Sequence, residues 1–354
     1  MTDLAIPDDW DSVTAEWMTK MLAASHPGVA VSSVDLVLRD DGTNRRARFA
    51  LDYSRGVGPA QVFLKAVDPD HAELNRLTGG LFNEVRLFNS GVVIPCEHPE
   101  IYGALVDEPG LNFVMVMEDV LTRGADPRDA TRPLSIDQAA SGVRALARLH
   151  TAFWDHQFQG SADLAWVEPY VAWVGVMGAG IDMGIERCHQ HLPSEVQRMN
   201  GSQIEADYWA PYIGTVAAGP QTLLHGDAHV GNTYVLPDDE VGFLDWQVLR
   251  RGNHVIDLGY FLQGAVTVDD RRAHERDLVA EYLDALIPHT GERPILDDVW
   301  LRYRASASHG LALWLATASG AAWQRPEVSL ALAERYAAAF VDLETADAVA
   351  TLCS

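Results

Sequence analysis

The chain has 354 residues, 48% of them hydrophobic, and a formal net charge of −24. This length is enough for one large domain or two medium ones with apolar cores. The charge excludes nucleic acid as a partner, because phosphate backbones need a basic surface. It could favour a cationic substrate, but a generally acidic, solubilising surface is the commoner reason for such a charge.

The cysteines and the first residues bear on the compartment. Cys96, Cys188 and Cys353 are far apart and form no C-x-x-C pair, a pattern that favours a reducing compartment over a disulfide framework or a thiolate metal site. The first twenty residues are acidic and lack the cationic and apolar regions of a signal peptide. No apolar stretch reaches the ~20 residues that a membrane span needs. We therefore expect a cytoplasmic protein with no membrane span.

The first third of the chain has the pattern of a sheet. Apolar residues at helical spacing predict an opening helix over 10–21. Alternating residues over 31–38 and 47–53, followed by the short apolar run 62–66, predict a three-stranded antiparallel meander. A helix near 81–89 and two further strands, near 101–106 and 112–117, complete this part.

The pattern becomes helical after residue 120. Ser135, with Gln138 three residues later, is a capping-box signature that opens a helix. Strand signals return briefly over 221–245, and the remaining helices are expected at 255–262, 271–286, 297–318 and 327–343. A β-rich part followed by a helical part predicts an α+β class. We expect a bilobal protein with a cleft between its lobes, the first covering 1–118 and the second 119–354.

The strongest chemical signal is the segment 223–232, Leu-Leu-His-Gly-Asp-Ala-His-Val-Gly-Asn, followed by Asp245. Phosphoryl transfer to a hydroxyl needs a carboxylate that orients the acceptor and oxygen ligands that hold Mg²⁺. Protein kinases place an Asn five residues after the catalytic Asp and a further Asp beyond it. Asp227, Asn232 and Asp245 have this arrangement. A strand-loop-strand-turn-strand pattern is expected to bring the three side chains to one end of a small hairpin, where each one alone would read as an ordinary surface group.

These motifs resemble the aminoglycoside phosphotransferase and choline kinase superfamily, with its His-Gly-Asp loop at 225–227. The Asp-Trp-Gln at 245–247 and the run Asp-Leu-Gly-Tyr-Phe-Leu at 257–262 are most similar to its ecdysteroid-kinase-like branch. The resemblance covers roughly residues 36 to 261. It implies a protein-kinase-like fold, ATP (GTP in some relatives), Mg²⁺ and a small-molecule hydroxyl acceptor. In these terms Asp227 would be catalytic, and Asn232 and Asp245 would bind the metal.

The first third offers an independent test, because a kinase needs a strand Lys for the phosphates and a helix Glu to hold it. The chain has two lysines, Lys20 and Lys65, and Lys65 lies in the predicted strand 62–66. Glu84 follows on the predicted helix 81–89. We expect Lys65 to bind phosphates and Glu84 to position it, the alternative being an unrelated strand lysine and a surface glutamate.

Two further parts of a nucleotide site are expected. The strand that ends in Glu118, Asp119 and Val120 resembles the family's hinge, where main-chain groups would hold adenine. The loop 40–46 would cover the phosphates, yet its single glycine is Gly42. Thr43, Asn44 or Arg45 would then contribute in place of glycine amides.

Two other classes of function are open. The H-x-D-x-H pattern at 225–229, with acids and a histidine downstream, would suit a metal-dependent hydrolase. That class explains neither Lys65 with Glu84 nor Asn232, so His225 is expected to anchor the loop. Asp257 is expected to be an N-terminal or loop-bracing carboxylate of the helix it opens. An inactive nucleotide-binding regulatory module is the other alternative, disfavoured because no catalytic position is substituted.

The acceptor pocket is expected to be lined with aromatic residues. Tryptophans cluster in the part of the chain that faces the catalytic loop in this superfamily, and they offer large rigid contact surfaces: Trp166, Trp173, Trp209, Trp300, Trp314 and Trp323, with Trp246 beside Asp245. Each could instead pack helices. We favour a bulky, apolar alcohol slightly over a polyamine antibiotic, which the negative charge would suit.

Overall fold

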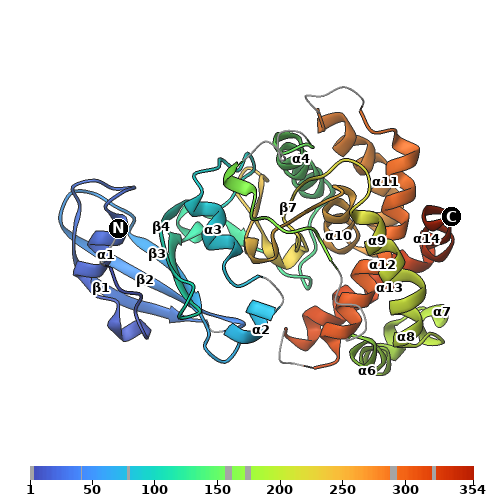
Figure 1. Ribbon diagram of the computed structural model, residues 1–354, viewed down its shortest axis with the longest axis horizontal. Helices are drawn as coiled ribbons and strands as arrows, with labels where there is room; N and C mark the ends of the chain where they lie inside the picture. The colour runs from blue at the N-terminus through green and yellow to red at the C-terminus, as the bar shows by residue number, and fades with distance from the viewer. Residues whose placement is uncertain are drawn as a thin grey trace. The chain divides into compact units, whose positions relative to one another are not determined.

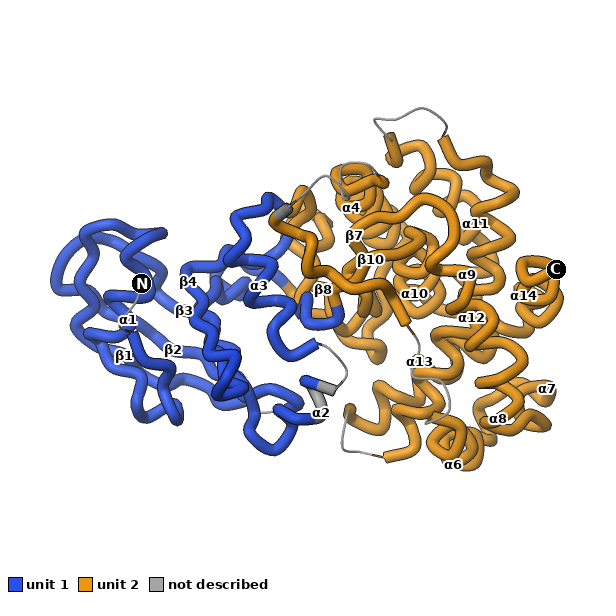
Figure 2. The backbone as a smooth tube through the Cα atoms, viewed as in Figure 1, with its two compact units in different colours: residues 1–93, 98–125, 245–248 blue, residues 94–97, 126–244, 249–354 orange. Residues whose placement is uncertain are grey.

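The computed structural model describes residues 4–40, 42–77, 80–155, 162–171, 177–287, 293–320 and 324–354. The chain divides into two compact units, coloured separately in Figure 2. Unit 1 comprises residues 1–93, 98–125 and 245–248, and unit 2 comprises residues 94–97, 126–244 and 249–354. The expected change from a β-rich part to a helical part is confirmed (Figure 1). Unit 1 also takes in a short segment of late sequence, which the sequence did not indicate.

Unit 1 is built on a five-stranded sheet of order β1-β2-β3-β5-β4, with antiparallel neighbours throughout. Its strands are β1 (Ala30–Arg39), β2 (Asn44–Arg55), β3 (Gln61–Val67), β4 (Ile101–Asp107) and β5 (Asn112–Glu118). Its helices include α1 (Ala15–Leu22), α2 (Ala72–Leu77) and α3 (Asn83–Asn89). The predicted meander is thus confirmed as β1, β2 and β3.

The opening helix is shorter than predicted. A 3₁₀ turn, η1 (Trp10–Ser12), ends at Val13, whose backbone is extended, and α1 begins only after Thr14. The Thr14 side chain accepts a hydrogen bond from the Trp17 N–H and caps the helix. The tryptophan spacing is therefore helical in pattern but interrupted in structure, and both tryptophans are still buried in one core.

Strand alternation sends side chains of this sheet to two faces. One face packs against α1 through residues such as Phe49 and Leu64. The other packs against the α3 region through Phe63 and Met115. Lys65 is in register with Met115, so it lies on the α3 face. This placement of a lysine opposite a helix that carries Glu84 follows from the period of the strand.

Unit 2 contains two small sheets. β6 (Asp126–Pro127), β8 (Thr233–Val235) and β9 (Val241–Phe243) form one, and β7 (Thr222–Leu224) pairs with β10 (Arg250–Gly252) in the other. The expected hairpin exists as β8 and β9. β7 does not join it but pairs with β10, because the chain returns to β7 after the turn η7 (Trp246–Val248). The 3₁₀ turn η6 (Val230–Asn232) separates β7 from β8.

Helices make up most of unit 2. The capping box of Ser135 and Gln138 opens the first of them, as predicted. Its long helices are α4 (Ile136–Ala152), α6 (Gly178–Cys188), α10 (Val255–Ala265), α11 (Val268–Ala285), α12 (Leu296–Ala318), α13 (Pro326–Asp342) and α14 (Thr345–Cys353). Shorter pieces are η3 (Ala162–Leu164), η4 (His189–His191), α7 (Ser194–Gln197), α8 (Gly201–Gln203), the π-helical turn η5 (Ile204–Trp209) and α9 (Ala210–Val216).

α10 is the central helix of this unit. All of its residues are buried, and it packs among α4, α11, α12 and α13 (Figure 1). Gly142 of α4 permits close approach, since a Cβ there would lie 2.2 Å from the ring of Phe261. Within the described residues, no helix is long and apolar enough to span a membrane.

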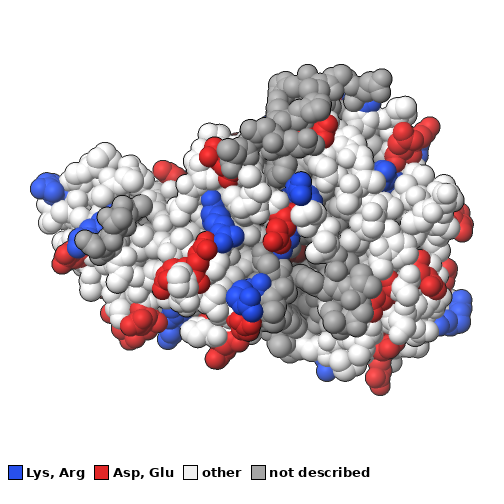
Figure 3. All heavy atoms as spheres, viewed as in Figure 1, with Lys and Arg blue, Asp and Glu red and all other residues white. Residues whose placement is uncertain are grey.

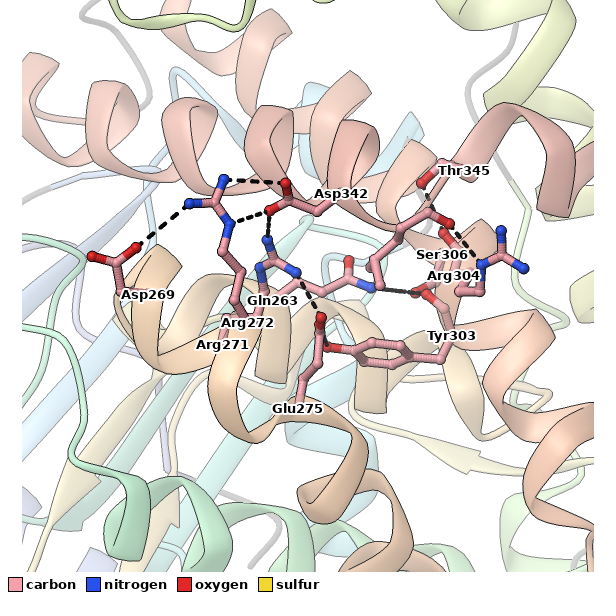
Figure 4. A network of polar contacts seen from close by, with 11 residues as sticks. Gln263, Asp269, Arg271, Arg272, Glu275, Tyr303, Arg304, Ser306, Asp342 and Thr345 are labelled. Atoms are coloured by element: carbon pink, nitrogen blue, oxygen red, sulfur yellow. Dashed lines mark hydrogen bonds and ion pairs between the residues drawn. The ribbon is translucent and has the colours of Figure 1, made fainter.

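A buried polar network ties α11 to its neighbours (Figure 4). Arg271, with a side chain only 1% exposed, pairs with Glu275 at 2.8 Å and with Asp342 of α13. Tyr303 of α12 donates to Glu275 at 3.0 Å. Burial raises the pKa of Glu275, and the charge of Arg271 opposes that rise. The two terminal nitrogens of the guanidinium are paired with the two carboxylates, while its buried Nε has no hydrogen-bond partner among the described residues, and the contacts join three helices.

Candidate functional site

Unit 1 brings Lys65, Glu84 and Asp245 together. The Lys65 Nζ lies 2.6 Å from Glu84 Oε2 and 2.7 Å from Asp245 Oδ1. The three side chains come from β3, from α3 and from the segment 245–248. Lys65 and Glu84 are almost fully buried, whereas the Asp245 side chain is 38% exposed. The predicted pairing of Lys65 with Glu84 is present, and Asp245 joins it.

One cation faces two carboxylates in this cluster, so its net charge is negative when all three are ionised. Burial would lower the pKa of Lys65, but the charges of Asp245 and Glu84 outweigh burial and raise it. The pKa of Glu84 is raised by burial, opposed by Lys65 and raised further by Asp245. The raised pKa of Lys65 shows that the two carboxylates favour a bound cation, whereas the raised pKa of Glu84 comes mainly from burial. A cluster with one cation and two carboxylates can bind a second cation at the carboxylates, or its lysine can pair with an anion instead.

The Asp245 backbone is strained, and hydrogen bonds from neighbouring side chains hold the residues that follow it in place. Its φ is +60°, a left-handed conformation that costs a non-glycine residue roughly 1–2 kcal/mol. The next N–H, that of Trp246, donates to Glu84 Oε1 at 3.2 Å. The main-chain oxygen of Gln247 accepts from Asn83 Nδ2 at 3.2 Å. Sequence reasoning missed Asn83, and no periodic signal marks it.

The predicted hinge residues lie at the end of β5. The Glu118 N–H donates to Glu100 O at 2.8 Å. The buried Asp119 accepts from the Leu121 N–H at 3.2 Å and lies 2.5 Å from Arg48 Nε. Among the residues that the structure describes, none accepts from the peptide N–H of Val120. Val120 therefore presents a main-chain donor in this segment.

Several residues of the predicted phosphate loop, 40–46, make contacts within unit 1. The Gly42 N–H donates to Asn44 O at 2.9 Å. The Asn44 side chain is buried and donates to Gln247 Oε1 at 2.6 Å. Arg45 donates to Val67 O and lies over the Trp10 ring. Thr43, between these residues, is half-buried.

Unit 2 holds the loop predicted to be catalytic, with Asp227 between β7 and η6. Asn232 Nδ2 donates to the main-chain oxygen of Asp227 at 2.9 Å and to its Oδ2 at 3.0 Å. The Asn232 amide is therefore oriented, with its nitrogen toward Asp227 and its oxygen turned the other way. The Leu244 N–H donates to Asn232 O at 2.8 Å, which fixes the end of β9 against the same residue. The Asp227 side chain is 31% exposed.

Asp257 braces this loop from α10, as the sequence indicated. Its two carboxylate oxygens accept from the His225 N–H at 2.7 Å and the Gly226 N–H at 3.0 Å. Gly226 has a φ of +82°, the left-handed region where glycine is unstrained. His150 Nε2 lies 3.3 Å from the same carboxylate. Asp257 is 2% exposed, so it acts on the loop's backbone.

The two histidines of the loop have structural partners. His225 Nε2 donates to Leu244 O at 2.9 Å, and its Nδ1 accepts from the Asp227 N–H at 3.3 Å. His229 Nδ1 accepts from the Gly231 N–H at 3.0 Å, so a neutral ring carries its proton on Nε2, 3.7 Å from Asp227 Oδ2. Both ring nitrogens of His225 are thus used, which disfavours the hydrolase alternative. The described residues contain no group of three or more acidic, histidine or cysteine side chains suited to a metal ion.

An aromatic group in unit 2 adjoins His229. The ring centroid of His229 lies 5.0 Å from that of Trp314 and 6.0 Å from that of Tyr260. The ring centroid of Tyr260 in turn lies 5.0 Å from that of His309. Burial lowers the pKa of His309 to about 3, so the ring is neutral. Trp209 Nε1 can only donate, so His309 Nδ1 accepts from it at 3.1 Å, and Nε2 donates to the Tyr170 hydroxyl at 3.1 Å.

The tryptophans predicted to line a pocket have different surroundings. Trp209 and Trp314 are buried in the group just described. Trp300 stacks on Tyr303, and Trp166 donates to the main chain of Asp163. Trp246, in unit 1, is buried, while Trp173 and Trp323 lie outside the described residues. Tyr170 and His309 were not predicted, because neither belongs to a motif.

Comparison with known proteins confirms the resemblance. A model described as the ecdysteroid kinase-like family matches residues 195–292. A crystal structure of a candidate aminoglycoside phosphotransferase from Ralstonia eutropha is 18% identical, with a TM-score of 0.53, and the match covers 94% of this chain and 97% of that one. Choline kinase from Cryptosporidium parvum is 10% identical, with a TM-score of 0.53 and coverage of 94% and 95%. No curated protein sequence matches the chain. The protein has the protein-kinase-like fold of these structures.

Proposed function

We propose that the protein is an ATP- and Mg²⁺-dependent kinase that phosphorylates a hydroxyl group of a small molecule. The observation that carries the proposal is the buried cluster of Lys65, Glu84 and Asp245. Desolvating these charges is costly, and stability alone gives weak reason to retain them. Ionisable groups perturbed by burial and by specific charged partners gather at functional sites.

Unit 1 supplies the nucleotide half of the site in this proposal. Lys65 would bind the α- and β-phosphates, and Glu84 would hold its ammonium in place. The peptide N–H of Val120, beside Glu118 and Asp119, would donate to the adenine ring, and GTP could replace ATP through the same main-chain groups. Nucleotide binding would thus belong to residues 1–118, with the short segment 245–248 packed in the same unit.

Asn232 and Asp245 are the proposed metal ligands. The donor set suits Mg²⁺, which prefers carboxylate and amide oxygens. Asn232 turns its nitrogen to Asp227, which leaves its oxygen for a cation. Asp245 carries the exposed carboxylate of a cluster with excess negative charge. When bound, the ion neutralises charge on the phosphate oxygens.

Asp227 would orient the acceptor and take its proton. The acceptor oxygen bonds to the γ-phosphorus as the bond from that phosphorus to the β–γ bridging oxygen breaks, and ADP leaves with that oxygen. The acceptor's proton passes to the Asp227 carboxylate. Asn232 and His229 hold that carboxylate through contacts at 3.0 and 3.7 Å, so it meets the hydroxyl in one orientation.

The acceptor is proposed to be a bulky, largely apolar alcohol, bound by the helical part of residues 119–354. The aromatic group around His229 supports this class, because such rings offer rigid apolar contact. The competing class is a polycationic antibiotic, which the charge of −24 would favour. In Figure 3, however, acidic side chains lie in small separate groups, several of them beside basic ones.

The proposal includes a cytosolic location for the enzyme, which is the location expected from the pattern of its cysteines.

The test is ATP turnover with defined acceptors. Purified protein with ATP and Mg²⁺ is offered ecdysone, geraniol, choline and kanamycin, and ADP release and phosphorylated product are measured. We expect product with an apolar alcohol and little with kanamycin. Efficient phosphorylation of kanamycin, with no binding or tryptophan quenching by ecdysone or geraniol, would contradict the apolar acceptor. ATP binding without any turnover would favour the regulatory module, and tightly bound zinc would favour the hydrolase.

A further inference from the structure

The loop expected to cover the phosphates contains a single glycine. Kinase-like sites hold phosphates with backbone N–H groups of a glycine-rich loop. Here the loop 40–46 has one glycine, and the N–H of Gly42 already donates to Asn44 O. A phosphate bound in unit 1 would therefore gain from neutral donors supplied by another segment.

Gln247 lies on the segment that could supply them. It follows Asp245 by two residues, and Asp245 is 2.7 Å from the Lys65 ammonium. Asn83, in the first turn of α3, donates a hydrogen bond from its side-chain nitrogen to the main-chain oxygen of Gln247. Gly80 packs against it, since a Cβ there would lie 3.1 Å from that oxygen. The Gln247 backbone is thus fixed beside the lysine cluster.

The side chain of Gln247 is fixed as well. Its Oε1 accepts from Asn44 Nδ2 at 2.6 Å. Asn44 is 2% exposed, and its Oδ1 has no hydrogen-bond partner among the described residues. Reversing both amides would keep one hydrogen bond but bury both N–H groups of Asn44 without an acceptor, which costs more than one buried oxygen. The orientation with the Gln247 oxygen toward Asn44 is therefore the stable one.

This orientation turns the Gln247 amide nitrogen away from Asn44. The residue is partly exposed, and over the described ranges no acceptor contacts its two N–H donors. We propose that Gln247 donates these N–H groups to a phosphate oxygen of the bound nucleotide, and that Asn44 is the positioning residue that sets their orientation. The inference rests on the proposed kinase function and deepens it. A neutral donor adds hydrogen bonds to the phosphate without competing for the carboxylate of Asp245.

The main test is the isosteric substitution Gln247→Glu. It retains an oxygen for Asn44 to donate to, and it replaces the N–H donors by a second oxygen. Calorimetric titration is done with ADP, with ADP plus Mg²⁺, and with adenosine, which has no phosphate. ADP should bind ~10–100-fold more weakly, since hydrogen bonds to charged groups are the strong ones. Adenosine affinity should not change.

Asn44→Asp tests the positioning role. A carboxylate at this position draws the Gln247 nitrogen toward itself, so ADP affinity should fall while adenosine affinity stays. In a Gln247→Leu background the same substitution should add little further loss, because there is no amide left to orient. Gln190→Glu, at an exposed position of unit 2, adds the same charge and serves as the control with unchanged ADP binding.

The outcomes separate this inference from the kinase proposal. If the wild-type protein binds neither ADP nor ATP, both fail. If Lys65→Ala weakens ADP binding while Gln247→Glu and Gln247→Leu bind like the wild type, the kinase proposal stands and the role of Gln247 is overturned. An equal loss of ADP and adenosine affinity in the Gln247 variants would also overturn it, since that result marks a general structural defect.

Discussion

The two units hold their candidate catalytic groups by different means. In unit 1, Lys65 and Asp245 are 180 residues apart and meet through charge in a buried cluster. In unit 2, Asp227 is held within ten residues of sequence, by Asn232, His229 and the backbone of its own loop. Asp257 and Leu244 reach that loop from farther along the chain. The proposed nucleotide half thus depends on tertiary charge pairing, and the proposed acceptor half depends mainly on local hydrogen bonds.

Asp227→Asn should have the largest effect. It retains the shape of the loop and an oxygen for Asn232, yet removes the proton acceptor, so kcat should fall by ~10²–10⁴-fold or more. ADP affinity and the thermal unfolding temperature should stay near the wild type. Steady-state kinetics on the acceptor found in the panel gives the measurement, and an unchanged kcat would end the assignment of Asp227.

Asp257→Ala should damage the local scaffold of unit 2. It leaves the N–H groups of His225 and Gly226 buried without their acceptor. The free energy of unfolding should fall by about 3 kcal/mol, the sum of two such losses. Urea denaturation measures this, and Asp257→Asn is the matched variant, expected to lose less because one oxygen remains. Equal stability of both variants and the wild type would show that the loop holds itself.

Lys65→Ala should break the charge cluster of unit 1. Nucleotide affinity should fall by ~10–100-fold, the range for losing hydrogen bonds to charged groups. Glu84→Gln should give a milder loss, because Lys65 keeps Asp245. Lys20→Ala is the control, since that lysine forms an exposed pair with Glu16 on α1. Calorimetric titration with ADP measures these affinities. Similar small effects of both lysine variants would show that β3 is not part of the nucleotide site.

His309 should give an effect that appears only on acidification, as a pH dependence of stability. Burial holds its pKa at about 3 in the folded protein, below the ~6.5 of an unfolded chain. The unfolded state therefore binds the proton first, so this stability is complete above that unfolded pKa and declines as pH falls toward 3. The decline approaches about 1.4 kcal/mol per pH unit. His309→Gln should flatten the profile between pH 6 and 4 by roughly that amount, and parallel profiles would contradict a buried neutral ring.

Several structural features of this protein could be predicted from local sequence patterns. The meander of β1 to β3 and the capping box of Ser135 depend on residues close in sequence, where alternation and caps have direct geometric meaning. The motif spacing of Asp227 and Asn232 likewise describes a local hydrogen-bonded loop. Lys65 was identifiable because the chain has only one other lysine.

Tertiary structure decided what depends on contacts distant in sequence. The opening helix is broken at Val13 because Thr14 caps α1 there, a competition that periodicity does not report. The pairing of β7 with β10, and the aromatic group of Trp209, His309 and Tyr170, join segments with no common motif. Asn44 was expected at the phosphate, yet its buried amide holds Gln247, more than two hundred residues away. Sequence determines which side chains are available to such contacts, and burial chooses among them because an unpaired polar group inside the protein is costly.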